Sequence, residues 1–254
     1  MNSISILSFR YHAKYGHFRK PYSNVSSLSY PFPPRTALAG LLGAILGVRK
    51  VEVPLILNED NLKVAVEIEK PLKTITHVTN LRKDGAGRIN YSVKKSKKNK
   101  KLSELKIIPD SNTPYPTPQE LLRCPSYIVY INLNDNMGEL VSRIRTKRFV
   151  YTPCMGLSGF LAELDYISEG VGKPLDPGQY DVSTVTDKAF GSLSLDWQNE
   201  AEDKHVVEVI APHLSTPDRT FTYKRYLLNM RSKPLPLRMT GNIYEFENKI
   251  ISFL

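Results

Sequence analysis

Alternating apolar and polar positions predict several strands along the chain. In the segment 3–9 serine alternates with Ile4 and Ile6, and the segment 62–70 ("LKVAVEIEK") alternates with the same period of two residues. Because successive side chains of a strand point to opposite faces of its sheet, both segments are predicted as strands with one buried face. Apolar runs predict further strands at 127–133, 157–168 and 204–211, and the C-terminus ends on another strand-like run.

Two segments carry apolar residues at helical spacing. The first helix is expected to open at Arg35 or Thr36, directly behind a proline, and to run to about Val48. Its uncharged stretch, 36–48, is well short of the roughly 20 apolar residues that span a bilayer, so a core helix is expected. The second helix is predicted within 137–153 by the spacing of its apolar residues, Leu140, Val141 and Ile144.

A strongly basic insertion separates the predicted strands. Residues 81–106 hold ten Lys or Arg side chains and only two acidic ones, Asp84 and Glu104, so this segment carries most of the chain's net charge of +10. Such a segment is expected to form a long basic hairpin or loop rather than a packed element. Prolines punctuate the following segment, 114–124, where a short helical turn is expected.

The order of these elements indicates the fold class. Strand, helix, strand, long insertion, strand, helix and strand follow one another, which resembles a ferredoxin-like βαββαβ unit with a β-rich extension. The sequence therefore predicts an α+β protein with two parts. Residues 1–190 would form the ferredoxin-like domain, and 191–254 would form the β-rich extension packed on it.

Composition adds information about partners and compartment. A net charge of +10 and a pI of about 9.4 favour a polyanionic partner, either nucleic acid or an anionic membrane surface, over a basic protein that has none. The two cysteines, Cys124 and Cys154, are not in a Cys-x-x-Cys pair, which disfavours a disulfide framework. The N-terminus lacks the charged start and long apolar core of a secretory signal, so a cytoplasmic protein is expected. A membrane-surface role is the weakest alternative, because the prolines and glycines of 31–47 do not make a lysine-faced amphipathic helix.

The sequence carries no convincing metal or nucleotide signature. The five histidines never fall at i,i+4 spacing, and none has a cysteine at ligand spacing. The paired glycines of "GAGRIN" and "GLSGFL" do not complete a phosphate-binding loop. Neither a metal site nor a cofactor is therefore predicted.

The strongest chemical signal is the interleaving of basic and aromatic residues. It occurs at 9–22 ("FRYHAKYGHFRKPY"), 88–95, 143–151 and 219–226 ("RTFTYKRY"). Lys and Arg neutralise phosphates while aromatic rings stack on unpaired bases, so this pattern favours single-stranded RNA over duplex. For arginines embedded among apolar residues, the alternatives are RNA binding and structural pairing.

Catalysis is an open alternative to simple binding. Metal-free RNA cleavage needs a general base and a cation near the reacting phosphate. The residue types are present within one short segment, because Tyr11, His12 or His17 could act together with Lys14. The other interpretation is that these side chains contact or stack on RNA without cleaving it.

Two stretches resemble a known family. The segment 16–47 ("GHFRKPYSNVSSLSYPFPPRTALAGLLGAILG") is similar to the N-terminal signature of the Cas family five proteins, and 149–164 ("FVYTPCMGLSGFLAEL") is a looser match. These are CRISPR-associated subunits of the RAMP superfamily that hold the 5′ end of the guide RNA in type I Cascade complexes. The N-terminal signature is most similar to type I-B members.

The resemblance implies a function, partners and site residues. The protein would cap the crRNA 5′ handle and contact the Cascade backbone subunit and large subunit, with target DNA near the PAM as a further partner. The insertion at about 71–124 would be a β-hairpin thumb. Type I-C relatives also cleave precursor crRNA, and this endoribonuclease activity is the alternative function, but no catalytic residue is assigned here. The expected RNA-binding residues are Lys14, His17, Arg19, Lys20, Arg35, Arg82, Arg88, Tyr91, Arg145, Lys147, Arg148 and Tyr151.

Overall fold

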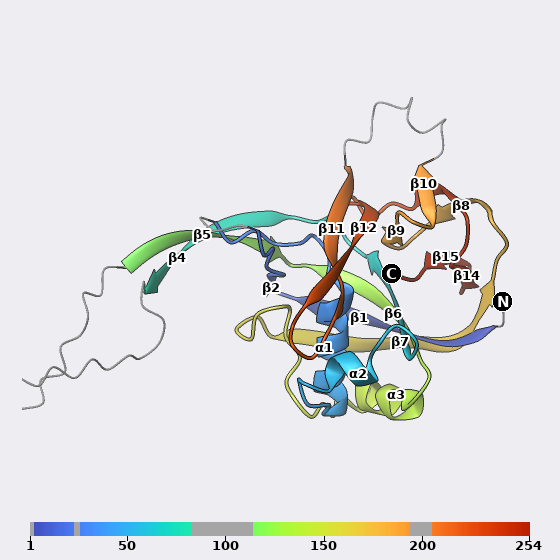
Figure 1. Ribbon diagram of the computed structural model, residues 1–254, viewed down its shortest axis with the longest axis horizontal. Coiled ribbons are helices and arrows are strands. Elements are labelled where there is room, and N and C mark those ends of the chain that lie inside the picture. Colours follow the sequence, from blue (N-terminus) through green and yellow to red (C-terminus); the bar gives the residue numbers. More distant parts are fainter. Residues whose placement is uncertain (1–2, 23–25, 83–113, 194–204) are drawn as a thin grey trace, which may run out of the picture.

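The fold is described from a computed structural model, which places residues 3–22, 26–82, 114–193 and 205–254 (Figure 1). Within these ranges the chain is a mixed α+β protein made mostly of strands, which confirms the predicted class. The helices are α1 (Arg35–Leu46), α2 (Val53–Ile56) and α3 (Met137–Thr146). The first strands are β1 (Ile4–Ala13), β2 (Tyr15–Gly16), β3 (Leu62–Ile68), β4 (Thr74–Arg82), β5 (Pro114–Arg123) and β6 (Ser126–Leu133). The later strands are β7 (Ala162–Pro174), β8 (Gly178–Val182), β9 (Thr186–Asp187), β10 (Gly191–Leu193), β11 (Val206–Ser215), β12 (Phe221–Asn229), β13 (Leu235–Met239), β14 (Ile243–Phe246) and β15 (Lys249–Ser252).

Four strands form the centre of the molecule. They lie in the order β7-β1-β6-β3, and each neighbouring pair is antiparallel. Helix α1 follows β1 and β2 in the chain and precedes β3, whereas α3 connects β6 to β7. Leu7 and Phe9 of β1 share one hydrophobic core with Leu42 of α1 and Ile144 of α3. This core fixes α1 relative to the sheet.

The opposite face of the sheet is partly covered by the C-terminal strands. β14 pairs with both β7 and β15, and β15 continues the sheet to β8, β13 and β10. Ile6, Tyr130 and Phe246 meet in a second core, where the rings of Tyr130 and Phe246 lie edge to face at 5.9 Å. The C-terminal strands thus extend the central sheet and bury part of its free face.

The β11–β12 hairpin packs against α1. Its two strands are antiparallel, and β9 pairs with β12. Ala211 and Tyr226 on its inner face are buried in the main core, and Tyr226 meets Phe32 edge to face at 5.6 Å. The outer face of the hairpin carries Ile210 and Tyr223, which are half exposed.

A ribbon of β4 and β5 projects from this body (Figure 1). Its antiparallel register runs from Thr74 opposite Leu122 to Arg82 opposite Pro114, and β2 pairs with the near end of β5. Most of the basic segment predicted as a hairpin, 81–106, lies outside the described residues.

The helical turn expected within 114–124 is wrong, because Pro114–Arg123 is a strand. Its prolines, at 114, 116 and 118, occupy alternate positions, so the three missing N–H groups lie on one side of the strand. Since β5 pairs through its other residues, the ladder with β4 survives. A run of alternate prolines is therefore compatible with a two-stranded ribbon.

The structure confirms most of the elements predicted from periodicity. The strands β3, β6 and β11 and the helices α1 and α3 lie where they were expected. β1 extends past the predicted 3–9 to Ala13, and β7 begins at Ala162 rather than at 157. In the described parts of the chain, no helix combines the length and hydrophobicity needed to cross a membrane.

Candidate nucleic-acid interface

A groove opens beside the N-terminal half of α1. It encloses about 580 Å³, and its walls are the loop after β2, the first turns of α1, the turn before α2 and the tip of the β11–β12 hairpin. We call it the cationic groove. Its walls include Phe18, Arg19, Thr36, Lys50, Arg219 and Phe221.

The charge of this groove is of one sign. Arg19, Lys50 and Arg219 line it, and none of its described lining residues is acidic. Arg19 and Lys50 are exposed, as is Arg219, and within the described ranges none of the three forms an ion pair. Unpaired cations in a groove that also exposes an aromatic ring, Phe221 at 42% exposed, suit a polyanion with unpaired bases.

The loop that presents Arg19 is fixed by buried hydrogen bonds. His17 is only 1% exposed, and its ring lies 2.7 Å from the Glu120 carbonyl oxygen and 2.9 Å from Ser27 Oγ. Tyr30 N–H donates to the Phe18 carbonyl at 2.7 Å, and an isolated bridge joins Arg19 to Ser29. The side chain of Arg19 thus projects from an ordered backbone.

The segment that contains Gly156 closes against the same loop. His17 N–H donates to the Met155 carbonyl at 3.0 Å, and the Tyr11 hydroxyl donates to the Cys154 carbonyl at 2.7 Å. Gly156 has φ +85°, and a Cβ atom there would lie 2.0 Å from the His17 carbonyl oxygen. Only glycine allows these two backbone segments to approach so closely.

A tight turn presents Arg219 and Phe221 at the tip of the β11–β12 hairpin. The N–H groups of Thr216 and Arg219 donate to the carbonyls of Thr220 and Thr216, each at 2.9 Å. Arg219 has φ 66°, so it lies in the left-handed region that ends such turns. The turn therefore places a cation and an aromatic ring on one wall of the groove.

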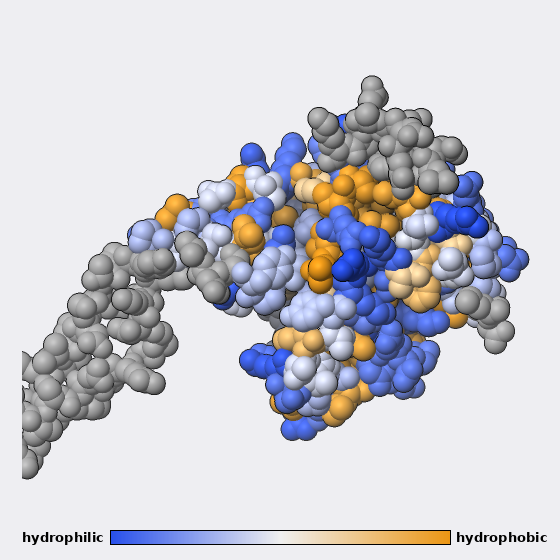
Figure 2. Space-filling view, turned by 45° about the horizontal axis from the view of Figure 1, so that its top comes forward, coloured by the Kyte–Doolittle hydropathy of each residue, from blue (hydrophilic) through white to orange (hydrophobic). Residues whose placement is uncertain are grey.

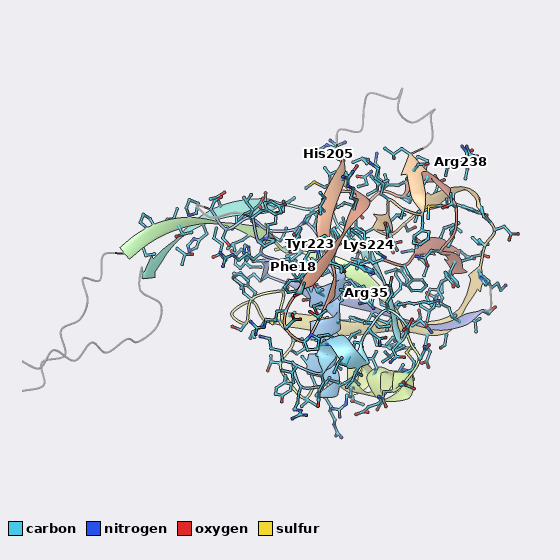
Figure 3. The ribbon with its side chains drawn as sticks, viewed as in Figure 1. Phe18, Arg35, His205, Tyr223, Lys224 and Arg238 are labelled. Carbon is cyan, nitrogen blue, oxygen red and sulfur yellow. The ribbon has the colours of Figure 1, made fainter. Side chains whose placement is uncertain are left out.

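A polar network, buried at His213 and Asp187 and exposed at Glu59, attaches this hairpin to the body. His213, 1% exposed, lies between the Tyr226 hydroxyl at 2.9 Å and Glu59 Oε1 at 3.1 Å. Lys224 Nζ lies 3.2 Å from Glu59 Oε1 and 3.4 Å from Asp187 Oδ2. Burial and the nearby cations Lys224 and Arg35 lower the pKa of His213, which favours the neutral ring. We call these four residues, His213, Glu59, Lys224 and Asp187, the hairpin clamp. In Figure 3 Lys224 is labelled beside Tyr223 and above Arg35.

Arg35 and His17 do not have the positions expected of RNA-binding residues. Arg35 is 2% exposed and donates to the carbonyl oxygens of Asn58 and Leu62 at 2.7 and 2.8 Å. His17 is equally enclosed, and burial lowers its pKa. Arg35 is not among the residues that line the groove, which corresponds to the structural alternative stated for embedded arginines, whereas His17 lines the groove as a buried residue.

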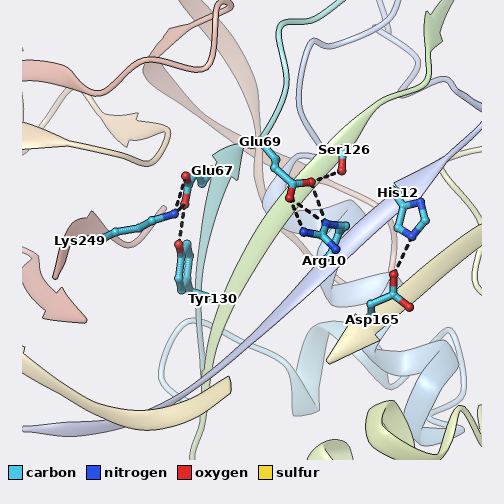
Figure 4. A network of polar contacts seen from close by, with 8 residues as sticks. All are labelled: Arg10, His12, Glu67, Glu69, Ser126, Tyr130, Asp165 and Lys249. Atoms are coloured by element: carbon cyan, nitrogen blue, oxygen red, sulfur yellow. Dashed lines mark hydrogen bonds and ion pairs between the residues drawn. The ribbon is translucent and has the colours of Figure 1, made fainter. Parts of the chain in front are cut away.

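Cations on the free face of the sheet are paired with acids. Arg10 holds Glu69 through bonds of 2.6–2.9 Å, and Glu69 also accepts from Ser126 (Figure 4). His12 Nε2 lies 2.9 Å from Asp165 Oδ2, and Lys249 pairs with Glu67 at 2.8 Å. These carboxylates neutralise the positive charge of the face, so the cationic groove is the better candidate for a phosphate site.

The structure also separates the residues of the catalytic hypothesis. Tyr11 is 2% exposed and burial raises the pKa of its hydroxyl well above its ordinary value, which opposes a role as general base. His17 faces the interior, whereas His12 is on the opposite face of β1 from Tyr11 and pairs with Asp165. Lys14 is exposed, and its Nζ lies 5.9 Å from the ring centroid of Tyr15. These four side chains do not converge on one point.

The remaining predicted residues lie elsewhere or outside the described ranges. Arg145 pairs with Glu169 at 2.7 Å and stacks over Tyr166 at 4.3 Å, and Lys147 pairs with Asp165 at 2.8 Å. Lys20 lies beside Tyr30, 5.8 Å from its ring centroid. Arg148 and Tyr151 are exposed after α3. Arg88, Tyr91 and the side chain of Arg82 lie outside the described residues.

Sequence reasoning missed two of the three groove cations. Arg219 belongs to the segment 219–226, whose interleaving of basic and aromatic residues is a signal for it. Lys50 has no comparable signal, because it follows an apolar helix. Among the described residues, no three His, Cys, Asp or Glu side chains gather in a way that could hold a metal ion.

Comparisons with known proteins bear on these observations. The model of a family described as CRISPR-associated protein (Cas_Cas5) matches residues 6–208. No curated protein sequence matches the chain. A crystal structure of a CRISPR protein from Archaeoglobus fulgidus is similar in fold, with a TM-score of 0.53 and 11% identity over 97% of this chain and 98% of that chain. A chain of a CRISPR RNA-guided surveillance complex has a TM-score of 0.49 and 13% identity, over 91% of both chains.

Proposed function

Because the chain belongs to the CRISPR-associated protein family Cas_Cas5, we propose that it is the RNA-binding subunit of a type I CRISPR interference complex, and that it caps the 5′ handle of crRNA. In this role it contacts the backbone and large subunits, with target DNA near the PAM as a further partner, and it acts in antiviral defence in the cytoplasm. The type I-B assignment is part of the proposal and rests on the signature at 16–47.

The observation that carries the proposal is the charge of the cationic groove. Three unpaired cations, Arg19, Lys50 and Arg219, converge there from three separate segments, without an acidic neighbour among the described lining residues. Phosphates of a single strand would contact these cations while bases stack on exposed rings. Figure 2 shows hydrophobic surface beside strongly hydrophilic surface on the body that carries this hairpin, as such mixed binding requires.

The architecture supports the same proposal. We propose that the order β7-β1-β6-β3, with α1 and α3 on one face, is that of a ferredoxin-like βαββαβ unit and that this unit is the core of the domain at 1–190. The β4–β5 ribbon would be the base of the thumb at about 71–124, and 191–254 would be the packed extension. The expected contacts of Arg82, Arg88 and Tyr91 belong to this thumb.

The test is RNA binding by full-length variants. The RNA is a single strand that carries the repeat-derived handle. We expect Arg19→Ala, Lys50→Ala and Arg219→Ala each to weaken its binding by about fivefold. This loss corresponds to about 1 kcal/mol for one charged contact. Arg238→Ala is the matched control, because Arg238 is exposed, lacks an ion pair within the described ranges and lies far from Phe18 (Figure 3). Equal losses in all four variants would contradict the groove as the RNA site.

The same preparation distinguishes binding from cleavage. RNA that stays intact in EDTA is the outcome expected for a noncatalytic subunit. Cleavage that His12→Ala abolishes would instead support the endoribonuclease alternative, with His12 and its partner Asp165 as the acid–base pair.

A further inference from the structure

A second groove, of about 600 Å³, lies between the loop after β2 and the outer face of β11–β12. Lys20, Pro21 and Tyr22 line one side, and the hairpin supplies the other side with Glu208, Val209, Ile210 and Tyr223. We call it the tyrosine groove. It is distinct from the cationic groove, since the two share no lining residue.

Its two tyrosines are placed to receive a flat ligand. Tyr22 is 65% exposed and Tyr223 is 46% exposed, and neither ring contacts another aromatic ring within the described part of the chain. They come from opposite walls of the groove. Exposed aromatic faces at a groove are the usual platform for an unpaired base.

Tyr30 connects the two grooves. It lines the cationic groove, while Lys20 of the tyrosine groove holds its ammonium 5.8 Å from the Tyr30 ring centroid. Burial raises the pKa of Tyr30, and the hydroxyls of Tyr22 and Tyr223 raise it further. A nucleic-acid strand could therefore place phosphates in one groove and an adjacent base in the other.

Glu208 adds a hydrogen-bond acceptor to the groove. Its carboxylate pairs with Lys188 at 2.6 Å and with Arg225 at 3.6 Å, so its charge is balanced and does not repel a phosphate strand strongly. A carboxylate has about four lone-pair sites, so these two contacts leave it able to accept a further hydrogen bond. A carboxylate accepts from the exocyclic amino groups of cytosine and adenine, whereas uracil has the acceptor O4 at that position, which a carboxylate repels.

We propose that the tyrosine groove takes one unpaired RNA base between Tyr22 and Tyr223, and that Glu208 selects bases that carry an amino group. This inference rests on the proposed function, because it assigns base selectivity to the same RNA-binding surface. The phosphates beside that base are held by Lys20 and by the cationic groove.

The test measures the affinity of the full-length protein for oligocytidine, oligoadenosine and oligouridine of about eight nucleotides. We expect the first two to bind about tenfold more tightly than oligouridine, since one charged hydrogen bond is gained. Tyr223→Ala should weaken all three by about 5- to 150-fold, whereas Tyr223→Phe, which keeps the stacking ring, should bind as the wild type does.

Glu208→Gln tests the selectivity itself. The glutamine amide can donate to uracil O4, so the affinity of the variant for oligouridine should approach its affinity for the other two oligomers. Lys188 and Arg225, released from their partner, would raise the affinity for all three oligomers alike, so the ratio of affinities is the readout. Glu163→Gln, an exposed acid on β7, should keep the wild-type ratio.

The outcomes separate this inference from the proposed function. Equal wild-type affinity for the three oligomers, or a Tyr223→Ala variant that binds as well as the wild type, would overturn the base site while RNA binding stands. A wild-type protein that binds none of the oligomers and no handle RNA would overturn the proposed function and this inference together.

Discussion

At Gly156 the backbone conformation and a close backbone neighbour require glycine. Its φ of +85° lies in the left-handed region, and a Cβ atom would lie 2.0 Å from the His17 carbonyl oxygen. The neighbour is backbone, held by the bond from His17 N–H to the Met155 carbonyl, so it cannot move aside cheaply. The segment 149–164 resembles a family signature. Its glycine at 156 is required because this segment packs against the loop after β2.

We expect Gly156→Ala to lower the free energy of unfolding by at least about 2 kcal/mol, from left-handed strain together with the clash. The measurement is urea denaturation of the full-length protein. Gly159→Ala is the control three residues away, because a Cβ there would meet no atom within 4 Å and its φ is not positive. Equal stability of the two variants would contradict this account.

Arg35 and Arg19 illustrate how similar sequence surroundings lead to different roles. Both are arginines beside prolines and aromatic residues in the N-terminal signature, but Arg35 is 2% exposed whereas Arg19 faces the groove. We expect Arg35→Ala to cost about 2–4 kcal/mol of stability, because two buried carbonyl oxygens, those of Asn58 and Leu62, lose their donor.

Arg19→Ala should leave stability within about 0.5 kcal/mol and weaken RNA binding instead. Denaturation and RNA titration of both variants test whether Arg35 stabilises the fold and Arg19 binds RNA. An Arg35→Ala protein of normal stability with reduced RNA affinity would restore Arg35 as a binding residue.

At the scale of elements, periodicity located the secondary structure that has a well-defined buried face. Alternation found β3 and apolar spacing found α1 and α3, because each of these elements buries apolar residues at the spacing of its own period. Short strands such as β9 and β10, with two or three residues each, are defined by their partners and leave no pattern of their own. β5 was missed because its prolines resemble a turn until its partner strand is known.

The hairpin clamp gives the β11–β12 element a pH-dependent attachment. His213 is buried beside Lys224 and Arg35, and its pKa is lowered chiefly by burial. The unfolded chain therefore takes up a proton near pH 6.5 while the folded protein resists it, so stability falls as the pH drops below about 6.5. Burial lowers the pKa of His17 as well, which gives the same sign.

We expect the free energy of unfolding to decrease between about pH 7.5 and 5.5, and His213→Gln to reduce that slope by at most about 1.4 kcal/mol per pH unit. The slope, rather than the stability at a single pH, is the measurement, because the variant also loses the contact with Glu59. The pKa values of Glu59 and Asp165 are also lowered, but these carboxylates change the stability only below about pH 5.5, since carboxylates titrate near pH 4. An unchanged slope in His213→Gln would show that the clamp does not titrate.

For the whole molecule, the charge total indicated a polyanionic partner but not where it binds. Basic residues are found throughout the sequence, and only the fold distinguishes Arg145 and Lys147, which have acidic partners, from the unpaired cations of the groove. The groove joins positions 19, 50 and 219, which are remote in sequence. Of the predicted residues, Arg19 and the buried His17 line this groove and Lys20 lines the adjoining one. The rest of the site depends on tertiary contacts that no local pattern encodes.

The salt dependence of RNA affinity distinguishes the groove cations from the other exposed cations. Each single-strand phosphate neutralised by a cation contributes about −0.7 to the slope of log affinity against log salt. A triple variant of Arg19, Lys50 and Arg219 to alanine should therefore have a slope about 2 smaller in magnitude than the wild type. Its control replaces Lys173, Lys233 and Arg238, which are exposed and have no ion pair among the residues that the structure describes. Both variants lose three charges, so a general effect of net charge would change their slopes equally, whereas a localised phosphate site changes only the first.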